Sequence, residues 1–128
     1  MILDSSAVIA IVLREPGYEA LVAKIGAARV AGIGAPTLAE TGLVLMAKLG
    51  KESRGVLSRF LQEAGLTVVP FGEQHWRVAV QAYARFGKGR HAAGLNFGDC
   101  LAYATARMAG QPLLCVGDDF ARTDLALA

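Results

Sequence analysis

Five acidic residues stand beside apolar segments that the chain is expected to bury, and carboxylates in such places are the groups best suited to chemistry here. They are Asp4, Glu40, Asp99, Asp118 and Asp119. Most have an ordinary structural interpretation when taken singly. Asp4 suits the N-cap of a helix, and Asp99, three residues after Asn96, suits a capping arrangement. Asp118 and Asp119 suit a turn.

Glu40 fits such an interpretation least well. In a helix beginning near Pro36, its same-face neighbours are the apolar residues Leu43, Val44 and Ala47. We therefore expect the Glu40 carboxylate to lie on the face that packs against the sheet. Burial of that charge is unfavourable unless a metal ion or a basic side chain from elsewhere in the chain meets it.

Short apolar runs alternate with longer amphipathic segments along the whole chain, which predicts an α/β fold. Strands separated by helices pair in parallel through right-handed crossovers, giving a three-layer sandwich around a small, mostly parallel central sheet. No linker or repeat interrupts the chain, and we expect a single domain over residues 1–128. The predicted strands are 1–3, 30–35, 66–71 and 113–116, and the predicted helices are 7–13, 18–29, 36–49, 52–64, 73–86, 96–109 and a short one after Phe120.

This order of elements brings the acids to one edge of the sheet. Asp4 and the pair Asp118-Asp119 follow strands, whereas Glu40 and Asp99 lie in early turns of helices, and in an open parallel sheet these positions share the edge of the carboxyl ends. Carboxylates crowded there repel one another unless a divalent cation offsets them. Oxygen ligands suit Mg²⁺ or Mn²⁺, and a cation of this kind beside basic residues indicates phosphodiester hydrolysis.

Basic residues gather in the glycine-punctuated segment before the predicted helix at 96. Arg85, Lys88, Arg90 and His91 could bind the backbone that flanks a scissile phosphate through sequence-independent contacts, or form a solvated surface loop. Ser6 could hold a metal-bound water or a phosphate oxygen, or act as a helix cap.

Composition restricts the protein class further. The 128 residues are 54% hydrophobic, yet charged residues break every apolar run, so we expect no membrane span and no signal peptide. Two cysteines are too few for a disulfide framework and suggest buried thiols of a reducing cytoplasm. The net charge of +2 is compatible with nucleic acid without indicating it.

The residues that carry these acids resemble the PIN domain family over the whole chain. The matching segments are Leu3-Asp4-Ser5-Ser6-Ala7, Pro36-Thr37-Leu38-Ala39-Glu40-Thr41, Asn96-Phe97-Gly98-Asp99-Cys100 and Gly117-Asp118-Asp119-Phe120. Within that family the chain is similar to VapC-type toxin ribonucleases of bacterial type II toxin–antitoxin pairs. The resemblance implies an endoribonuclease dependent on Mg²⁺ or Mn²⁺ that cleaves tRNA or ribosomal RNA, a homodimer, and inhibition by a cognate VapB-type antitoxin whose C-terminal segment occupies the acidic groove.

The resemblance also implies roles for individual residues. Asp4 and Asp99 would be metal ligands, and Glu40 would complete the cluster, directly or through water. Many family members carry the fourth acid where this chain has Gly117; here we favour Asp119 and keep Asp118 in reserve. Ser6, Lys88, Arg90 and His91 would contact the substrate.

Two other classes of protein remain as alternatives. A receiver-like phosphoacceptor domain would need an acidic pair after the first strand and a lysine after a late strand, and no lysine follows Lys88. A non-catalytic, acid-lined α/β module that binds a partner protein would share the acids without the chemistry. A nucleotide-cofactor fold is disfavoured because the first strand–helix turn lacks a glycine-rich phosphate loop.

Overall fold

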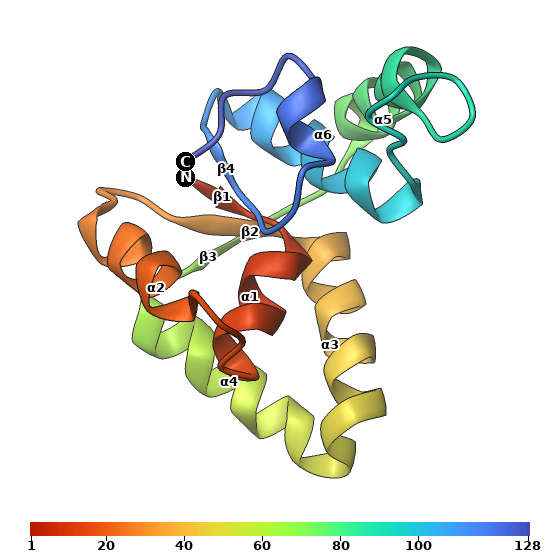
Figure 1. The fold of residues 1–128 in the computed structure, drawn as a ribbon. Coiled ribbons are helices and arrows are strands. Elements are labelled where there is room, and N and C mark those ends of the chain that lie inside the picture. Colours follow the sequence, from red (N-terminus) through yellow and green to blue (C-terminus); the bar gives the residue numbers. More distant parts are fainter.

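The structure is a computed structural model that describes all residues 1–128. Four short parallel strands form the centre of the molecule (Figure 1). The strand order is β3-β2-β1-β4 and every pairing is parallel, as an α/β chain with helical crossovers requires. The strands are shorter than the sequence predicts, because only two or three residues of each are paired. They are β1 Ile2–Leu3, β2 Gly32–Gly34, β3 Thr67–Val69 and β4 Leu113–Leu114.

Helices make up most of the chain, and their positions agree with the predicted ones to within a few residues. The predicted helix after Phe120 is instead one turn of 3-10 helix, and a second such turn precedes α4. None of the helices is both long and apolar enough to cross a membrane. They are α1 Ser5–Val12, α2 Tyr18–Ala27, α3 Ala35–Leu49, α4 Ser53–Ala64, α5 Glu73–Phe86 and α6 Phe97–Ala109, with the turns η1 Gly50–Glu52 and η2 Phe120–Arg122.

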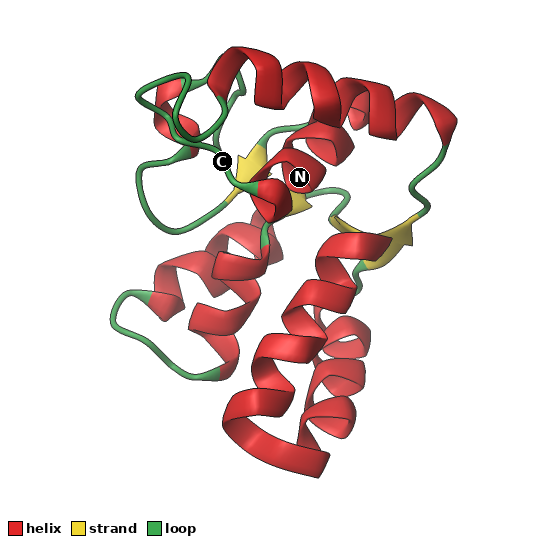
Figure 2. Cartoon of the chain, turned by 90° about the vertical axis from the view of Figure 1, so that its right-hand side faces the viewer, coloured by secondary structure: helices red, strands yellow, loops and turns green.

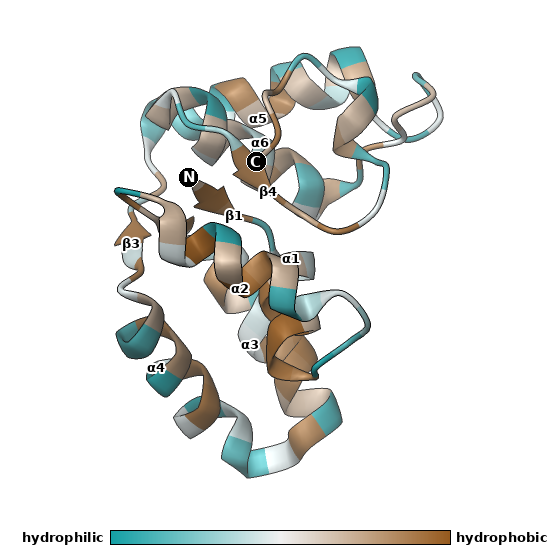
Figure 3. Ribbon diagram, turned by 60° about the vertical axis from the view of Figure 1, so that its left-hand side comes forward, coloured by the Kyte–Doolittle hydropathy of each residue, from teal (hydrophilic) through white to brown (hydrophobic).

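The sheet separates two apolar cores. Successive strand residues point to opposite faces, so Ile2 packs with α5 and α6 whereas Leu3 packs with α1 and α2. Leu113 and Leu114 divide in the same way. Figure 2 shows helices on both sides of the strands, and Figure 3 shows β1 and β4 hydrophobic along their length. This arrangement is the three-layer α/β sandwich that the alternation of elements predicts.

Helix α3 buries a different face from the one expected. The side chains of Thr37, Thr41 and Leu45 are at most 1% exposed, whereas Leu43 is 69% exposed. The buried residues lie four apart, and Glu40 is offset from them at the margin of the interface, half-buried. The expectation that Glu40 shares the sheet-packing face with Leu43, Val44 and Ala47 is therefore wrong. Small polar threonines serve as core residues on this helix, which a hydrophobicity pattern does not reveal.

Helix α6 crosses close over the end of β2 because Gly34 has no side chain. A Cβ built on Gly34 would lie 2.6 Å from Thr105 Oγ1 and 3.2 Å from Thr105 Cγ2. Thr105 is itself buried, and its hydroxyl donates to the Leu101 carbonyl at 2.9 Å. The close approach fixes the height of α6 over the sheet, and with it the position of Asp99.

Gly34→Ala should therefore destabilise the protein by about 1–3 kcal/mol, the usual effect of an extra methyl group in a packed interface. Urea unfolding measures the change. In a Thr105→Ala background the same substitution should be less unfavourable, because the clashing hydroxyl and methyl are gone. An equal effect of Gly34→Ala in both backgrounds would contradict this account of the packing.

Candidate functional site

Asp4 lies at the carboxyl end of β1, where the strand passes into α1. Its carboxylate caps α1: Oδ2 accepts from the backbone N–H of Ser6 at 3.1 Å and from the Ser6 hydroxyl at 2.6 Å. The residue is only 5% exposed. Burial raises the pKa of Asp4, the hydrogen bonds from Ser6 oppose the rise, and the charge of Asp119 adds to it. Asp4 is thus an N-cap and a buried carboxylate at the same time.

Glu40 and Asp99 meet at the first turn of α6. A Cβ on Gly98 would overlap the Glu40 carboxylate, lying 3.0 Å from Oε1 and closer still to Oε2. The glycine therefore lets Glu40, from α3, lie directly against the α6 backbone beside Asp99. Gly98 lies within the segment Asn96–Cys100, and its sequence position alone does not predict this role.

Asp99 is held by a capping box. Its Oδ2 accepts from the backbone N–H of Asn96 at 3.0 Å, and its own N–H donates to Asn96 Oδ1 at 2.9 Å. The pKa of Asp99 is raised to about 6, mainly by burial, with further contributions from the charges of Asp4, Asp119 and Glu40. Carboxylates from four separate parts of the chain thus act on one another at one edge of the sheet, where the starts of α1, α3 and α6 and the loop after β4 come together (Figure 1).

The two acids after β4 differ in their effect on this cluster. The charge of Asp119 contributes to the raised pKa of both Asp4 and Asp99, whereas Asp118 is not among the causes of either shift. The backbone reverses at Gly117, where φ is +99°, before Asp119 leads into η2. These observations favour Asp119 over Asp118 as the fourth member of the cluster.

No lysine or arginine forms an ion pair with any of these four carboxylates; the three ion pairs of the molecule involve Glu73 and Asp124. As the side chains stand, no three His, Cys, Asp or Glu residues are close enough together to hold one metal ion. Asp4 and Asp99 are instead directed to local donors. The donor chemistry nevertheless fits a hard divalent cation, since all the acceptors are carboxylate oxygens and no protein cation neutralises them.

Ser6 connects the cluster to the last strand. Its hydroxyl donates to Asp4 and accepts from the backbone N–H of Val116 at 3.0 Å. Since its one proton is directed to Asp4, Ser6 positions the Asp4 carboxylate and the chain that follows β4. The expected contact of Ser6 with substrate stays a prediction.

The basic loop, which carries Lys88, Arg90 and His91, joins α5 to α6. Backbone hydrogen bonds at 2.9 Å, from Lys88 to Leu95 and from Leu95 to Phe86, close it. Lys88, Arg90 and His91 are exposed, and none pairs with an acid. The His91 ring lies edge-on to Phe86, and its Nδ1 accepts from the Ala93 N–H at 3.0 Å. The loop leads directly into the α6 turn that carries Asp99.

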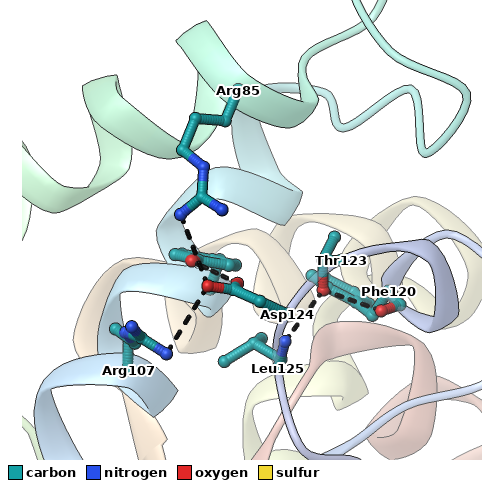
Figure 4. A network of polar contacts seen from close by, with 7 residues as sticks. Arg85, Arg107, Phe120, Thr123, Asp124 and Leu125 are labelled. Carbon is teal, nitrogen blue, oxygen red and sulfur yellow. Dashed lines mark hydrogen bonds and ion pairs between the residues drawn. The ribbon is translucent and has the colours of Figure 1, made fainter.

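Arg85 does not belong to this basic loop, contrary to the sequence-based expectation. It lies in the last turn of α5, where it pairs with Asp124 at 3.4 Å, as Figure 4 shows. Arg107 reaches the same carboxylate at 3.6 Å and the Tyr103 hydroxyl donates to it at 2.6 Å. These contacts, the Tyr103 hydrogen bond foremost, lower the pKa of Asp124. No local sequence pattern predicts this network, because its members are distant along the chain.

The fold is that of a known class of protein. Residues 1–125 match the PIN domain family, and the chain belongs to that family. Within it, the chain belongs to the VapC ribonucleases, the toxins of toxin–antitoxin systems. It is 47% identical to ribonuclease VapC36 of Mycobacterium tuberculosis over 126 residues, covering 98% of this chain and 91% of that protein. It is 38% identical to ribonuclease VapC of Mycolicibacterium smegmatis, covering 98% of each chain.

Solved structures show the same fold. VapBC2 from Rickettsia felis, bound to a DNA fragment from its promoter, superposes with a TM-score of 0.80 over 99% of this chain and 96% of that one, at 16% identity. Mycobacterium tuberculosis VapC20, a sarcin-ricin loop cleaving toxin, gives a TM-score of 0.79 over 99% of this chain and 97% of that one, at 15% identity.

The raised pKa of Asp99 gives a testable dependence of stability on pH. In EDTA the folded protein keeps a proton on Asp99 up to about pH 6, whereas the unfolded chain releases it near pH ~3.9. The folded state binds more protons over this interval, so its stability falls as pH rises from about 4 to 7. We expect Asp99→Asn to reduce this fall and to melt above the wild type at pH 7.5 in EDTA, by roughly 3–5 °C for each 1 kcal/mol gained.

Asp124→Asn is the matched control, since its carboxylate has a lowered pKa and cationic partners; it should melt below the wild type. Millimolar Mg²⁺ or Mn²⁺ should raise the melting temperature of the wild type and not that of Asp99→Asn. An Asp99→Asn variant that melts lower than the wild type in EDTA at neutral pH would contradict the electrostatic account.

Gly98→Ala should lower the activity of the site while leaving the stability of the fold nearly unchanged. The new methyl group meets the flexible end of Glu40, and alanine in a helix is favoured over glycine by about 0.5–1 kcal/mol, so stability should change little. The Glu40 carboxylate must shift, and ribonuclease activity should fall by about tenfold or more. Gly26→Ala on α2, with no atom within 4 Å of its Cβ, is the control and should keep full activity. Equal activities of the two variants would show that the Glu40–Gly98 contact has no functional role.

Proposed function

We propose that this protein is an endoribonuclease that cleaves tRNA or ribosomal RNA with the help of Mg²⁺ or Mn²⁺, and that a VapB-type antitoxin inhibits it. One observation carries the proposal: carboxylates from four separate chain segments converge at one edge of the sheet without a lysine or arginine to neutralise them. Such an arrangement is unfavourable in a structural role and suits a protein that binds a cation there.

Asp4 and Asp99 are the proposed direct ligands of that cation, since they are the two acids whose own pKa values are raised at the junction. Glu40 and Asp119 complete the negative site. When bound, the cation would offset the charge of the scissile phosphate and lower the pKa of an attacking water. The protein's own contribution is to orient the carboxylates: Ser6 holds Asp4, Asn96 holds Asp99, and the bare backbone of Gly98 admits Glu40.

The substrate reaches the site along the basic loop. Lys88, Arg90 and His91 are exposed, unpaired with acids, and stand just before α6. Phosphate contacts from such residues position a nucleic acid without reading its sequence. We assign them to the RNA backbone on one side of the cleaved bond. We also propose a cytoplasmic location, which an RNA substrate and the two free thiols support.

The antitoxin is the second proposed partner. Structural neighbours of this chain include the VapBC2 assembly and a toxin–antitoxin complex from Klebsiella pneumoniae. A groove of about 420 Å³ between α1, α2 and α4 is lined mostly by apolar residues, among them Ile11, Val22 and Phe60. An apolar antitoxin segment would fit this groove, and a basic residue of the antitoxin would neutralise the acid cluster.

We also propose that the protein forms a homodimer. Leu43 and Met46, 69% and 47% exposed, stand three residues apart on α3 and give that helix an apolar outer face. A stable dimer commonly buries about 800 Å² on each partner, so further contacts beyond α3 are required.

The adjacent acids Asp118 and Asp119 give the sharpest test of the proposed site. Asp119→Asn should lower RNA cleavage by about 100-fold or more and reduce the rise in melting temperature that Mn²⁺ produces, because its charge acts on Asp4 and Asp99. Asp118→Asn removes the same charge one residue away. It should keep most of the RNA cleavage and most of the rise in melting temperature with Mn²⁺.

The measurement is sequencing of newly formed RNA ends after purified protein is incubated with total bacterial RNA and Mn²⁺, with EDTA and Asp4→Asn as blanks. Cleavage sites present in the wild type and absent from both blanks support the proposal. A wild type that yields no such sites, or an Asp4→Asn variant that cleaves like the wild type, would refute the nuclease assignment and favour the non-catalytic binding module.

A further inference from the structure

We propose that the apolar pocket between α5 and α6 binds one unpaired nucleobase of the RNA, next to the phosphate that is cleaved. This inference rests on the proposed nuclease function and adds a base-binding subsite to it. The pocket has a volume of about 260 Å³ and every side chain that lines it is apolar or aromatic: Ala79, Val80, Tyr83, Phe97, Cys100 and Leu101.

The large hydrophobic residues at the rim of the pocket are unusually exposed to solvent. Phe97 is 79% exposed, the largest value of any large hydrophobic side chain in the molecule, and Val80 and Tyr83 are 60% and 41% exposed. An exposed phenylalanine beside an apolar hollow has the form of a stacking surface. Base–aromatic stacking contributes about 1–3 kcal/mol for each base in single-stranded nucleic-acid complexes.

The pocket adjoins the acid cluster through the first turn of α6. Phe97 is two residues before Asp99, and between them Gly98 lies against the Glu40 carboxylate. Residues two apart on a helix project to opposite sides, roughly 200° around the axis. One turn therefore directs Phe97 toward the pocket and Asp99 toward the carboxylates, so a nucleotide lying across the start of α6 places its base on one side and its phosphate on the other.

The charges around the pocket match a nucleotide better than an apolar peptide. The Arg90 guanidinium lies 5.5 Å from the centroid of the Tyr83 ring, and the Tyr83 hydroxyl donates to the Lys88 carbonyl at 3.5 Å. Neither Arg90 nor Lys88 pairs with an acid. The pocket thus combines an apolar floor with the Arg90 guanidinium at its margin, which attracts a base and its flanking phosphate together.

The lining also indicates how the base is recognised. Its one hydroxyl, that of Tyr83, is already directed to Lys88, so the pocket offers stacking without reading hydrogen bonds on the base edge. The base must be unpaired to expose its face. We therefore expect cleavage in single-stranded loops, with a nucleotide preference set by stacking strength.

The test uses full-length protein with Mn²⁺ and a fluorescent RNA oligonucleotide that spans a cleavage site mapped in total RNA. Phe97→Ala should lower kcat/KM by about tenfold or more, whereas Phe97→Trp should retain most of it because the ring is kept. Trp76→Ala is the matched control: it removes an exposed aromatic ring of α5 outside the pocket and should leave kcat/KM unchanged. The rise in melting temperature with Mn²⁺ should be the same in all variants, which shows that the acid cluster is intact.

The outcomes separate the two proposals. If the wild type cleaves no RNA, or Asp4→Asn cleaves as well as the wild type, the nuclease proposal fails. If the wild type cleaves and Phe97→Ala has the same kcat/KM, the base subsite alone is wrong. Sedimentation of each variant tests whether a second copy of this chain occupies the pocket instead. If Phe97→Ala loses activity because a dimer dissociates, the loss is reversed at high protein concentration. That result would assign the pocket to the second copy and overturn the inference.

Discussion

Repulsion among carboxylates at one edge of the sheet is the constraint on which the functional arrangement depends. Parallel strands bring their carboxyl ends to the same edge, and a helix that returns to the start of the next strand begins at that edge as well. Asp4, Glu40, Asp99 and Asp119 therefore meet because of topology, although they are spread from the start of the chain to its end. Their proximity is expressed in the pKa of Asp99, which burial and the three other charges together raise to about 6.

Asp124 is an acid with a structural role in the same molecule, and its surroundings differ from those of the edge cluster. Asp124 accepts a hydrogen bond from Tyr103 at 2.6 Å and lies within 3.6 Å of two guanidinium groups, and its pKa is lowered (Figure 4). In doing so it fixes the C-terminal segment to α5 and α6. At the sheet edge, by contrast, the pKa values of Asp4 and Asp99 are raised, and none of the four carboxylates has a cationic partner. This contrast within one chain, more than the presence of acids as such, is why we assign the edge cluster to ligand binding and Asp124 to folding.

Local sequence signals predict the elements of this fold well, because caps and breakers act over a few residues. Asn96 as N-cap, Gly110 at the end of α6 and the bounds of α5 follow from such signals. The lateral order of the strands does not follow from them, and neither does the orientation of α3, whose buried face is built from Thr37 and Thr41. The pairing of Arg85 with Asp124, 39 residues apart, leaves no periodic trace in the sequence. The site residues could be nominated from their types and positions, but the contact of Glu40 with Gly98 depends on how two helices pack.

The local hydrogen bonds within the cluster resolve a conflict between folding and function. Burial raises the pKa values of Asp4 and Asp99 and so favours their protonated forms, yet a protonated carboxyl is a poor ligand for a cation. Donors from Ser6 and Asn96 favour the charged forms and oppose the rise in pKa. With a pKa near 6, Asp99 is about 90% ionised at pH 7, so a cation can bind with little release of protons. The caps that begin α1 and α6 thus also favour the charged forms of these two acids, so a change made at either helix start also changes the electrostatics of the site.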